Sequence, residues 1–324
     1  MTLRIFINGF GRIGRTITRM VLTGHADIEI VGINDIAPLE TCAYLFGYDS
    51  IFGPFPGGAE ERDGGLLAGG RRIPMSHFAD ISALDLSGVD IVMECTGKAD
   101  SRKIAERGLV AGAARVLISG PSDAADETIV LGANHERLAG QKVISNASCT
   151  TNALAPLLRL LDEAAGVESG HMTTVHCYTG SQPTVDAPRG DLVRSRAAAL
   201  SMVPTTTSAG RLIGVVLPHL AHRIEARAIR VPTASVSAID LTVQTRAPIT
   251  AQRFNELVQA ADPLLFGYTE MPLVSTDLRG RPESLIVAGR ETSVSLGGVL
   301  RIFGWYDNEW GFSARMLDMA RRMA

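Results

Sequence analysis

One short segment near the amino terminus limits the folds open to this chain more than any other. Gly9, Gly11 and Gly14 in NGFGRIG form a G-x-G-x-x-G pattern between the apolar run Leu3–Ile7 and a helical pattern over Arg12–Leu22. Glycines let a strand turn closely into a helix, and they let backbone approach a pyrophosphate that faces the helix N-terminus. The segment predicts the start of a parallel, nucleotide-binding sheet, although a plain tight turn is the alternative.

An acidic residue follows at the spacing that this motif requires. IEIVGI at 28–33 is a second β-branched run, and Asp35 lies 21 residues beyond Gly14. A carboxylate at this place accepts hydrogen bonds from ribose hydroxyls and repels a 2′-phosphate. The glycines and Asp35 together therefore predict a site for NAD rather than NADP.

The remaining runs divide the chain near residue 148. With 324 residues, the chain is longer than one hydrophobic core usually fills, so two domains are expected. Before residue 148, Val/Ile runs alternate with helical stretches, which is typical of a parallel sheet buried on both faces. The expected elements are strands at 90–94, 115–119, 128–131 and 142–145, a helix over 98–108 and an irregular hairpin over 53–74.

After residue 148 the apolar and polar residues alternate more often, which indicates a mostly antiparallel sheet. The expected elements are strands at 170–177, 224–231, 236–246, 284–287 and 299–305, a helix over 249–261 and a C-terminal helix over 311–324. The predicted fold is α/β, with a Rossmann-type parallel sheet followed by an α+β domain.

Composition and charge exclude several classes of protein. Lys and Arg number 31 against 34 Asp and Glu, a net charge of −3 that gives no basic surface for nucleic acid or anionic membranes. No apolar stretch approaches the roughly 20 residues of a membrane-spanning helix. The four cysteines contain no CxxC pair, and the chain starts directly with a strand-like run. We expect a cytoplasmic protein with no signal peptide, and the histidine spacings predict no metal site.

The segment SNASCTTN at 145–152 places a cysteine at the start of a helix. Ser148 is a candidate N-cap, so Cys149 lies in the first turn, where the helix dipole lowers a thiol pKa and an N–H can face an oxyanion. His176 ends the run 170–177 and is the candidate base. A small buried cysteine without chemistry is the alternative.

Other nearby residues are given structural roles. Pro156 does not suit a helix that starts at Thr150, so the helix either kinks or begins near Ala155. Cys177 should point away from His176 and pack, because neighbouring strand residues face opposite sides. Cys42 and Cys95 are expected in the core.

Together these segments resemble the phosphorylating glyceraldehyde-3-phosphate dehydrogenase family. The matching motifs are NGFGRIGR, YDS at 48–50, SNASCTTN, the Thr179-x-Ser181 pair, RVPT at 230–233 and WYDNEWGFS at 305–313. They occur in order over essentially the whole chain. The resemblance implies an NAD-binding domain over 1–148 with 311–324, and a catalytic domain over 149–310.

The resemblance also implies roles for individual residues and an activity. Cys149 is the implied nucleophile and His176 its base. The implied NAD contacts are Asn8, Gly9, Gly11, Arg12, Ile13, Gly14, Asp35, Thr96, Ser119 and Asn308. The implied substrate-phosphate and inorganic-phosphate residues are Thr179, Ser181, Arg230, Ser148, Thr150, Thr207 and Ser208. The implied reaction is reversible, NAD-dependent oxidation and phosphorylation of glyceraldehyde 3-phosphate to 1,3-bisphosphoglycerate through a cysteine thioester, in a homotetramer.

Several positions depart from the family pattern. Ser208 stands where glycine is usual and Arg211 where lysine is usual, both beside the implied inorganic-phosphate site. Phe52 replaces a histidine. The segments YTEMPLVS and NEWGFSARMLD are closer to the erythrose-4-phosphate dehydrogenase branch, which stays open as an alternative. A catalytically idle relative, acting as a thiol sensor or scaffold, is the second alternative, and a salt bridge or a core role is the structural alternative for Arg230.

Overall fold

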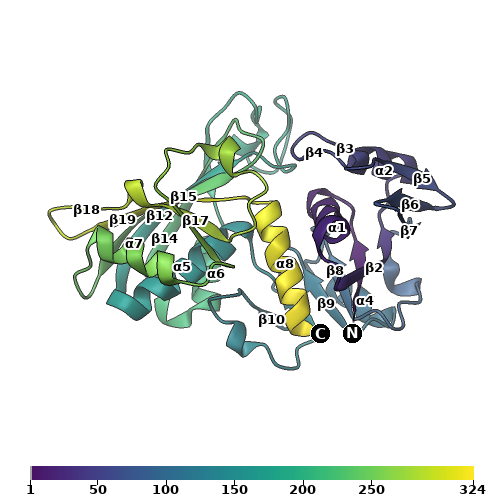
Figure 1. The fold of residues 1–324 in the computed structure, drawn as a ribbon, viewed down its shortest axis with the longest axis horizontal. Coiled ribbons are helices and arrows are strands. Elements are labelled where there is room, and N and C mark those ends of the chain that lie inside the picture. Colours follow the sequence, from purple (N-terminus) through teal and green to yellow (C-terminus); the bar gives the residue numbers. More distant parts are fainter. Residues whose placement is uncertain (1) are drawn as a thin grey trace. The chain divides into compact units, whose positions relative to one another are not determined.

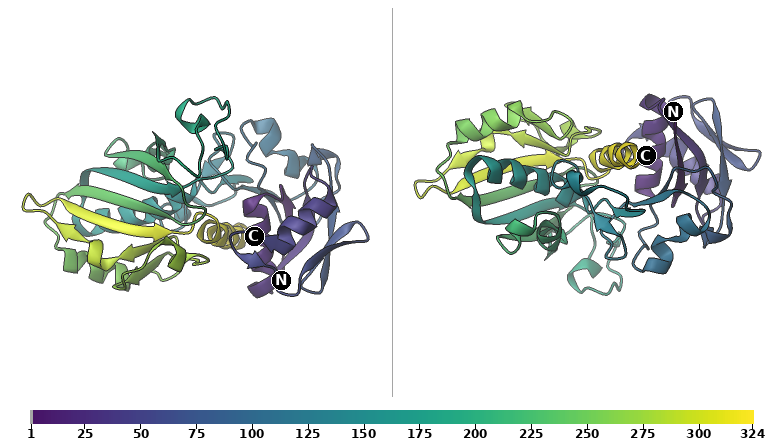
Figure 2. Two further views of the ribbon diagram at one scale, coloured as in Figure 1. Left: turned by 90° about the horizontal axis from the view of Figure 1, so that it is seen from above. Right: turned by 90° about the horizontal axis from the view of Figure 1, so that it is seen from below.

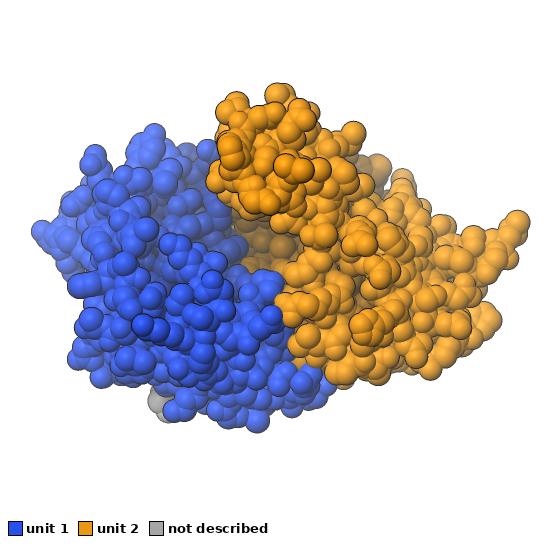
Figure 3. All heavy atoms as spheres, turned by 180° about the vertical axis from the view of Figure 1, so that it is seen from behind, with its two compact units in different colours: residues 1–129, 136–147, 313–324 blue, residues 130–135, 148–312 orange. Residues whose placement is uncertain are grey.

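The computed structural model describes residues 2–324, which form two compact units (Figure 3). Unit 1 comprises residues 2–129, 136–147 and 313–324, and unit 2 comprises 130–135 and 148–312. The expected domains differ from these units at three places, because residues 130–135, Ser148 and residues 311–312 belong to unit 2.

Unit 1 is built on a nine-stranded sheet of order β10-β11-β9-β8-β1-β2-β7-β6-β5 (Figure 1). The strands from β10 to β7 pair in parallel, whereas β7, β6 and β5 pair antiparallel. Their bounds are β1 Leu3–Asn8, β2 Ile28–Asn34, β5 Ala59–Arg62, β6 Gly65–Ala68, β7 Arg71–Ser76, β8 Ile91–Glu94, β9 Arg115–Ile118, β10 Glu127–Thr128 and β11 Val143–Ser145. The predicted Rossmann-type sheet is confirmed, and the hairpin expected over 53–74 extends its edge.

The helices of unit 1 differ from the prediction in one place. They are α1 Arg12–Gly24, α2 Leu39–Gly47, α3 Arg102–Ala105 and α4 Arg107–Val110; a small hairpin of β3 Tyr48–Asp49 and β4 Gly53–Pro54 follows α2. The continuous helix expected over 98–108 is wrong. Residues Lys98 to Asp100 form a turn instead, in which Lys98 N donates to Thr96 Oγ1 and Asp100 N donates to Lys98 O. Short side-chain bonds of this kind compete with helical ones.

Unit 2 contains an eight-stranded sheet of order β13-β14-β12-β15-β19-β17-β16, with β18 paired to β19. Only β12–β14 and β16–β17 run parallel among the pairs of residues 2–324, so the predicted mostly antiparallel sheet is confirmed. The bounds are β12 Val167–Cys177, β13 Val203–Thr206, β14 Ile224–Val231, β15 Ser237–Thr245, β16 Phe266–Thr269, β17 Leu285–Ala288, β18 Ser293–Val294 and β19 Leu300–Tyr306.

The two views of Figure 2 show helices α5 Cys149–Ala165, α6 Ala209–Val216 and α7 Ala251–Ala260 on one face of this sheet. Helix α5 begins at Cys149, so the alternative start near Ala155 is wrong. Pro156 lies inside the helix, buried beside Leu154, Leu157 and other apolar side chains. Burial of that face outweighs the one backbone bond that proline removes.

Helix α8, Trp310–Met323, ends the chain near the predicted C-terminal helix. No helix among residues 2–324 is long and apolar enough to cross a bilayer.

Candidate active site

The first turn of α5 holds Cys149, the predicted nucleophile. Ser148 is extended at the N-cap, and its side chain accepts a hydrogen bond from Thr151 N at 3.1 Å. The residue before it, Ala147, has a φ of 55°, a left-handed conformation that turns the chain sharply into the helix. Cys149 is therefore the first helical residue, at the helix position that the sequence predicted.

His176, near the end of β12, lies beside this thiol. Sγ of Cys149 is 3.6 Å from Nε2 of His176. On the other side of the ring, Nδ1 lies 2.7 Å from the carbonyl oxygen of Cys177, which can only accept a hydrogen bond. When the ring proton is on Nδ1 and is donated to this carbonyl, the Nε2 lone pair faces the thiol, which suits a base.

Arg230 is the third member of the cluster. The parallel pairing of β12 with β14 sets Arg230 directly opposite His176. Its Nη1 donates to Cys177 O at 3.0 Å and lies 2.9 Å from Nδ1 of His176. The arginine thus lies beside the predicted base, and no ion pair of Arg230 occurs among residues 2–324, so the salt-bridge alternative has no support there.

The pKa values of the pair follow from burial and this cation. Desolvation, then the charge of Arg230, lowers the pKa of His176 to about 4, so the ring is neutral at pH 7. Cys149 is partly exposed as a residue, but protein atoms crowd its sulfur, and this desolvation raises the thiol pKa. Arg230 and the groups of Thr150 and Cys149 at the helix start act in the opposite direction but are smaller. The helix start therefore lowers the thiol pKa as expected, but burial raises it by more.

The predicted phosphate residues fall into separate groups. Thr179 Oγ1 and Ser181 Oγ lie 2.9 Å apart, after the end of β12. Thr207 and Ser208 precede α6, where Thr207 Oγ1 accepts from Ala209 N at 3.2 Å. The antiparallel register pairs Thr206 with Arg227 and Val203 with Arg230. Three strand residues span roughly 10 Å, so Thr207, which follows β13, and Arg230 lie at different places along β14.

Two other predicted phosphate residues already have protein partners. The Ser148 hydroxyl caps α5 and contacts Thr151 Oγ1 at 2.7 Å. The Thr150 hydroxyl is buried and bonds to Tyr306 Oη at 2.9 Å, and Tyr306 Oη also bonds to Thr174 Oγ1 at 2.8 Å. Tyr306 therefore ties the start of α5 to β12 and β19, a role that sequence reasoning missed.

Arg194 was also missed. Its Nε donates to Thr205 Oγ1 at 2.8 Å and its Nη2 donates to Thr206 O at 3.1 Å, one and two residues before Thr207. This places a cation beside the predicted inorganic-phosphate residues. No local sequence pattern signals the contact, because Arg194 lies in a short 3-10 helix, Val193–Ser195, that only the fold brings to β13.

The YDN part of WYDNEW has a structural explanation. Asp307 accepts hydrogen bonds from the backbone N–H groups of Gly280, Glu309 and Trp310, and so fixes the start of α8. Asn308 is nine-tenths buried, and its Oδ1 lies 3.1 Å from Sγ of Cys177.

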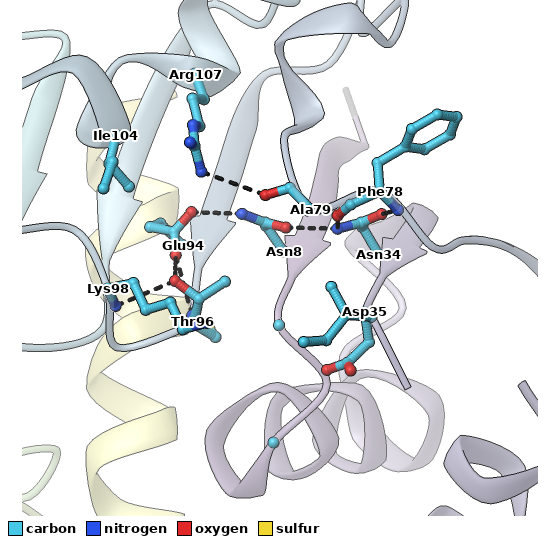
Figure 4. A pocket seen from close by; sticks show the side chains of 14 residues that line it. Asn8, Asn34, Asp35, Phe78, Ala79, Glu94, Thr96, Lys98, Ile104 and Arg107 are labelled. Atoms are coloured by element: carbon cyan, nitrogen blue, oxygen red, sulfur yellow. Dashed lines mark hydrogen bonds between the residues drawn. The ribbon is translucent and has the colours of Figure 1, made fainter. Parts of the chain in front are cut away.

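Unit 1 contains a cavity of about 270 Å³ at the carboxyl ends of its parallel strands (Figure 4). The predicted cofactor residues that line it are Asn8, Gly9, Gly11, Asp35 and Thr96. Other lining residues, which sequence reasoning missed, include Asn34, Phe78, Glu94, Lys98 and Arg107. A crevice at this end of a parallel sheet is where dinucleotides bind.

A network of amides and carboxylates holds the rim of this cavity. Asn8 donates to Glu94 at 2.6 Å and accepts from Asn34 at 2.9 Å, joining β8, β1 and β2. Thr96 donates to Glu94 through both its N–H and its hydroxyl. Asp35 accepts from Phe10 N at 2.6 Å, which ties the carboxylate to the glycine loop.

Four predicted cofactor residues of unit 1 do not line the cavity: Arg12, Ile13, Gly14 and Ser119. Arg12 donates to Asp49 at 2.6 Å and its guanidinium lies over the Phe52 ring, 5.6 Å from the centroid. The aromatic residue at position 52 therefore contacts this arginine. Ser119 directly follows β9, at the carboxyl edge of the sheet.

The three glycines of the nucleotide loop are needed for different structural reasons. A Cβ on Gly9, whose φ is +97°, would lie 2.7 Å from the backbone of Cys95 and Thr96, and one on Gly14 would lie 2.2 Å from Gly9 O. These two are required by the turn itself. A Cβ on Gly11 meets no protein atom within 4 Å, so the bare backbone there leaves open space at the start of α1. The cavity, its carboxylate and this exposed helix start fit a dinucleotide.

Comparisons with known proteins agree with both units. Residues 3–102 match the family model described as "Glyceraldehyde 3-phosphate dehydrogenase, NAD binding domain", and residues 148–308 match "Glyceraldehyde 3-phosphate dehydrogenase, C-terminal domain". Proteins named glyceraldehyde-3-phosphate dehydrogenase from Xanthobacter flavus, Cereibacter sphaeroides and Pseudomonas aeruginosa are each 46% identical to the chain. Each alignment covers 100% of this chain and 99% of the relative.

Proposed function

The chain belongs to the glyceraldehyde-3-phosphate dehydrogenase family and is an NAD-dependent oxidoreductase, and from this we propose that it oxidises and phosphorylates glyceraldehyde 3-phosphate. The product would be 1,3-bisphosphoglycerate, and the reaction is reversible. The observation that supports this most is the 3.6 Å distance between Cys149 Sγ and a His176 Nε2 whose lone pair faces the sulfur. We assign unit 1 as the NAD-binding domain and unit 2 as the catalytic domain.

Cys149 and His176 act first as a neutral pair. The raised pKa of Cys149 and the pKa of about 4 for His176 keep the proton on sulfur at neutral pH. As sulfur forms a bond to the aldehyde carbon, Nε2 takes the thiol proton and returns it to the carbonyl oxygen. The product is a neutral hemithioacetal on Cys149, and the N–H at the start of α5 can bind its oxygen.

His176 then acts a second time. It takes the hydroxyl proton of the hemithioacetal, while the carbon loses a hydride and becomes a thioester carbonyl on Cys149. When bound, NAD supplies the hydride acceptor for this oxidation. We assign its binding to the residues that line the unit 1 cavity, together with Arg12, Ile13, Gly14, Ser119 and Asn308.

The thioester is finally opened by inorganic phosphate. A phosphate oxygen bonds to the thioester carbon, the carbon–sulfur bond breaks, and His176 returns to the departing sulfur the proton that it took from the hemithioacetal. We assign the substrate's phosphate to Thr179, Ser181 and Arg230. The inorganic phosphate is assigned to Ser148, Thr150, Thr207 and Ser208, with the cation of Arg194 beside them.

The assembly is proposed to be a homotetramer. Support comes from apolar side chains of the segment 178–203 that the chain leaves uncovered. Leu192 is 91% exposed, Leu200 is 83% exposed and Met202, one residue before β13, is 75% exposed. Exposed apolar surface of this kind marks an interface, and analytical ultracentrifugation of the purified protein tests it. We further propose a cytoplasmic location, with neither nucleic acid nor membrane as a partner.

The experiment that tests the activity compares two aldehydes. Purified protein is assayed for NADH formation with glyceraldehyde 3-phosphate and with erythrose 4-phosphate, each with and without inorganic phosphate. The proposal expects faster turnover of glyceraldehyde 3-phosphate and a requirement for phosphate. Faster turnover of erythrose 4-phosphate without need for phosphate would favour the erythrose-4-phosphate alternative. Absence of turnover with both would favour the idle relative.

A further inference from the structure

Cys177 occupies the last position of β12 and is fully buried. Three of its groups make contacts in unit 2. Its N–H donates to Ser237 Oγ at 3.2 Å, and its carbonyl oxygen accepts from His176 and Arg230. Its sulfur lies 3.1 Å from Oδ1 of Asn308. The side chain was expected only to pack, but it has a polar partner.

The chemistry of the two groups fixes the direction of this bond. A carboxamide oxygen only accepts hydrogen bonds, so the thiol must be the donor. Burial raises the pKa of Cys177 to about 12, so the thiol keeps its proton throughout the neutral range. With Oδ1 bound to the thiol, the NH₂ group of Asn308 is directed to the opposite side of the amide.

The NH₂ group of Asn308 is the part without a protein partner. Among residues 2–324, no acceptor binds Nδ2 of Asn308, although the residue is only 8% exposed. Asp307, the preceding residue, already fixes the local backbone by accepting three N–H hydrogen bonds. The Cys177 thiol therefore restricts the side-chain torsions of Asn308. Nδ2 is not among the buried side-chain atoms without a partner, so this NH₂ group reaches the surface and is open to a ligand.

We propose that Cys177 is a positioning residue, whose thiol holds the Asn308 carboxamide so that its NH₂ group meets the carboxamide oxygen of the nicotinamide. The inference rests on the proposed function, which assigns Asn308 to the cofactor. Because the Cys177 carbonyl also lies 2.7 Å from Nδ1 of His176, one strand end contacts both the proposed base and the side chain assigned to the cofactor amide. No covalent step is involved.

The test measures ligand binding rather than turnover. Isothermal titration calorimetry gives the dissociation constants of NAD and of ADP-ribose, which lacks the nicotinamide ring. Cys177→Ala is expected to weaken NAD binding about tenfold, as the loss of one hydrogen bond predicts. The dissociation constant of ADP-ribose should stay within about twofold of its value in the unmodified protein. Cys177→Ser keeps a donor and should hold NAD within about threefold of the unmodified protein. A change in packing alone would change the dissociation constants of NAD and ADP-ribose by the same factor.

Controls separate the outcomes. Cys177→Val refills the volume without a donor and should give the same split if Cys177→Ala fails to fold. Cys42→Ala removes a buried thiol that contacts a backbone carbonyl in unit 1, and should affect neither ligand. In the double variant Cys177→Ala/Asn308→Ala, NAD should bind no more weakly than in Asn308→Ala alone.

Two results would overturn the proposal in distinguishable ways. If Asn308→Ala selectively weakens NAD but neither Cys177→Ala nor Cys177→Val does, the role of Cys177 is wrong while the cofactor assignment stands. If Asn308→Ala leaves the ratio of NAD to ADP-ribose affinity unchanged, the assignment of Asn308 to the cofactor is wrong, and the proposal for Cys177 is wrong with it.

Discussion

Nη1 of Arg230 lies 2.9 Å from Nδ1 of His176, on the side of the ring opposite Cys149. The cation therefore acts on both members of the pair, because it lowers the pKa of the imidazole and of the thiol. A group assigned to substrate binding thus also sets the protonation state of the base.

Replacing this cation should raise the pKa of His176. In Arg230→Gln we expect the pKa to move up from about 4 toward 6.5, without reaching it because burial remains the largest cause. Since the base acts in its neutral form, which is lost as the pH falls through the pKa, the acid limit of activity should move to higher pH. NMR titration of the His176 ring measures the shift. Arg227→Gln, an exposed arginine on the same strand, should leave the pKa unchanged; equal shifts in both variants would contradict the local effect.

Removing the base should slow chemistry without weakening cofactor binding. For His176→Asn we expect the single-turnover rate of acylation to fall by about 10²–10⁴, the usual contribution of a positioned base. His171→Asn changes an exposed histidine on the same strand and serves as the control. A His176→Asn rate within a few fold of the unmodified protein would show that another group takes the proton.

Alanine substitutions at two glycines of the nucleotide loop should have different effects, one on stability and the other on NAD binding. Gly14→Ala drives a Cβ to 2.2 Å from Gly9 O, so we expect a loss of about 1–3 kcal/mol in the free energy of unfolding. Gly11→Ala meets no protein atom and has a permitted φ of −72°, so its cost should stay below about 1 kcal/mol, while NAD affinity falls about tenfold. Thermal unfolding and NAD titration of both variants measure this. Equal destabilisation of the two would contradict the assignment of Gly11 to the ligand side.

The Tyr306 hydroxyl should contribute to stability through two threonines. Tyr306→Phe leaves the buried hydroxyls of Thr150 and Thr174 without that partner, and we expect a cost of about 1–3 kcal/mol in the free energy of unfolding. Urea titration measures it. Tyr48→Phe alters a tyrosine that is 63% exposed and should change stability by less than about 0.5 kcal/mol. If the two variants behave alike, the buried hydroxyl bridge contributes nothing measurable.

Local sequence patterns predicted the elements well where each pattern is self-contained. The glycine loop, the parallel runs around it and the cysteine at a helix start all depend on a few neighbouring residues. The helix expected over 98–108 was wrong because Thr96 and Lys98 bond within a turn, a competition that helical periodicity does not register. Pro156 led us to expect a later helix start than the structure has. The backbone hydrogen bond that proline removes is a local loss, whereas the burial that offsets this loss comes from the whole of α5.

By itself, the sequence predicted most strands of both sheets, the family, and the candidate nucleophile and base, since these follow from residue types at short spacings. Only the tertiary structure decided the protonation states and the partners. Desolvation of Cys149 depends on atoms from several elements, so the direction of its pKa shift could not be predicted from the helix start. In the same way, strand register brought Arg230 to His176, and folding brought Tyr306 to Thr150 and Asn308 to Cys177. These contacts join residues far apart along the chain, and no local pattern encodes them.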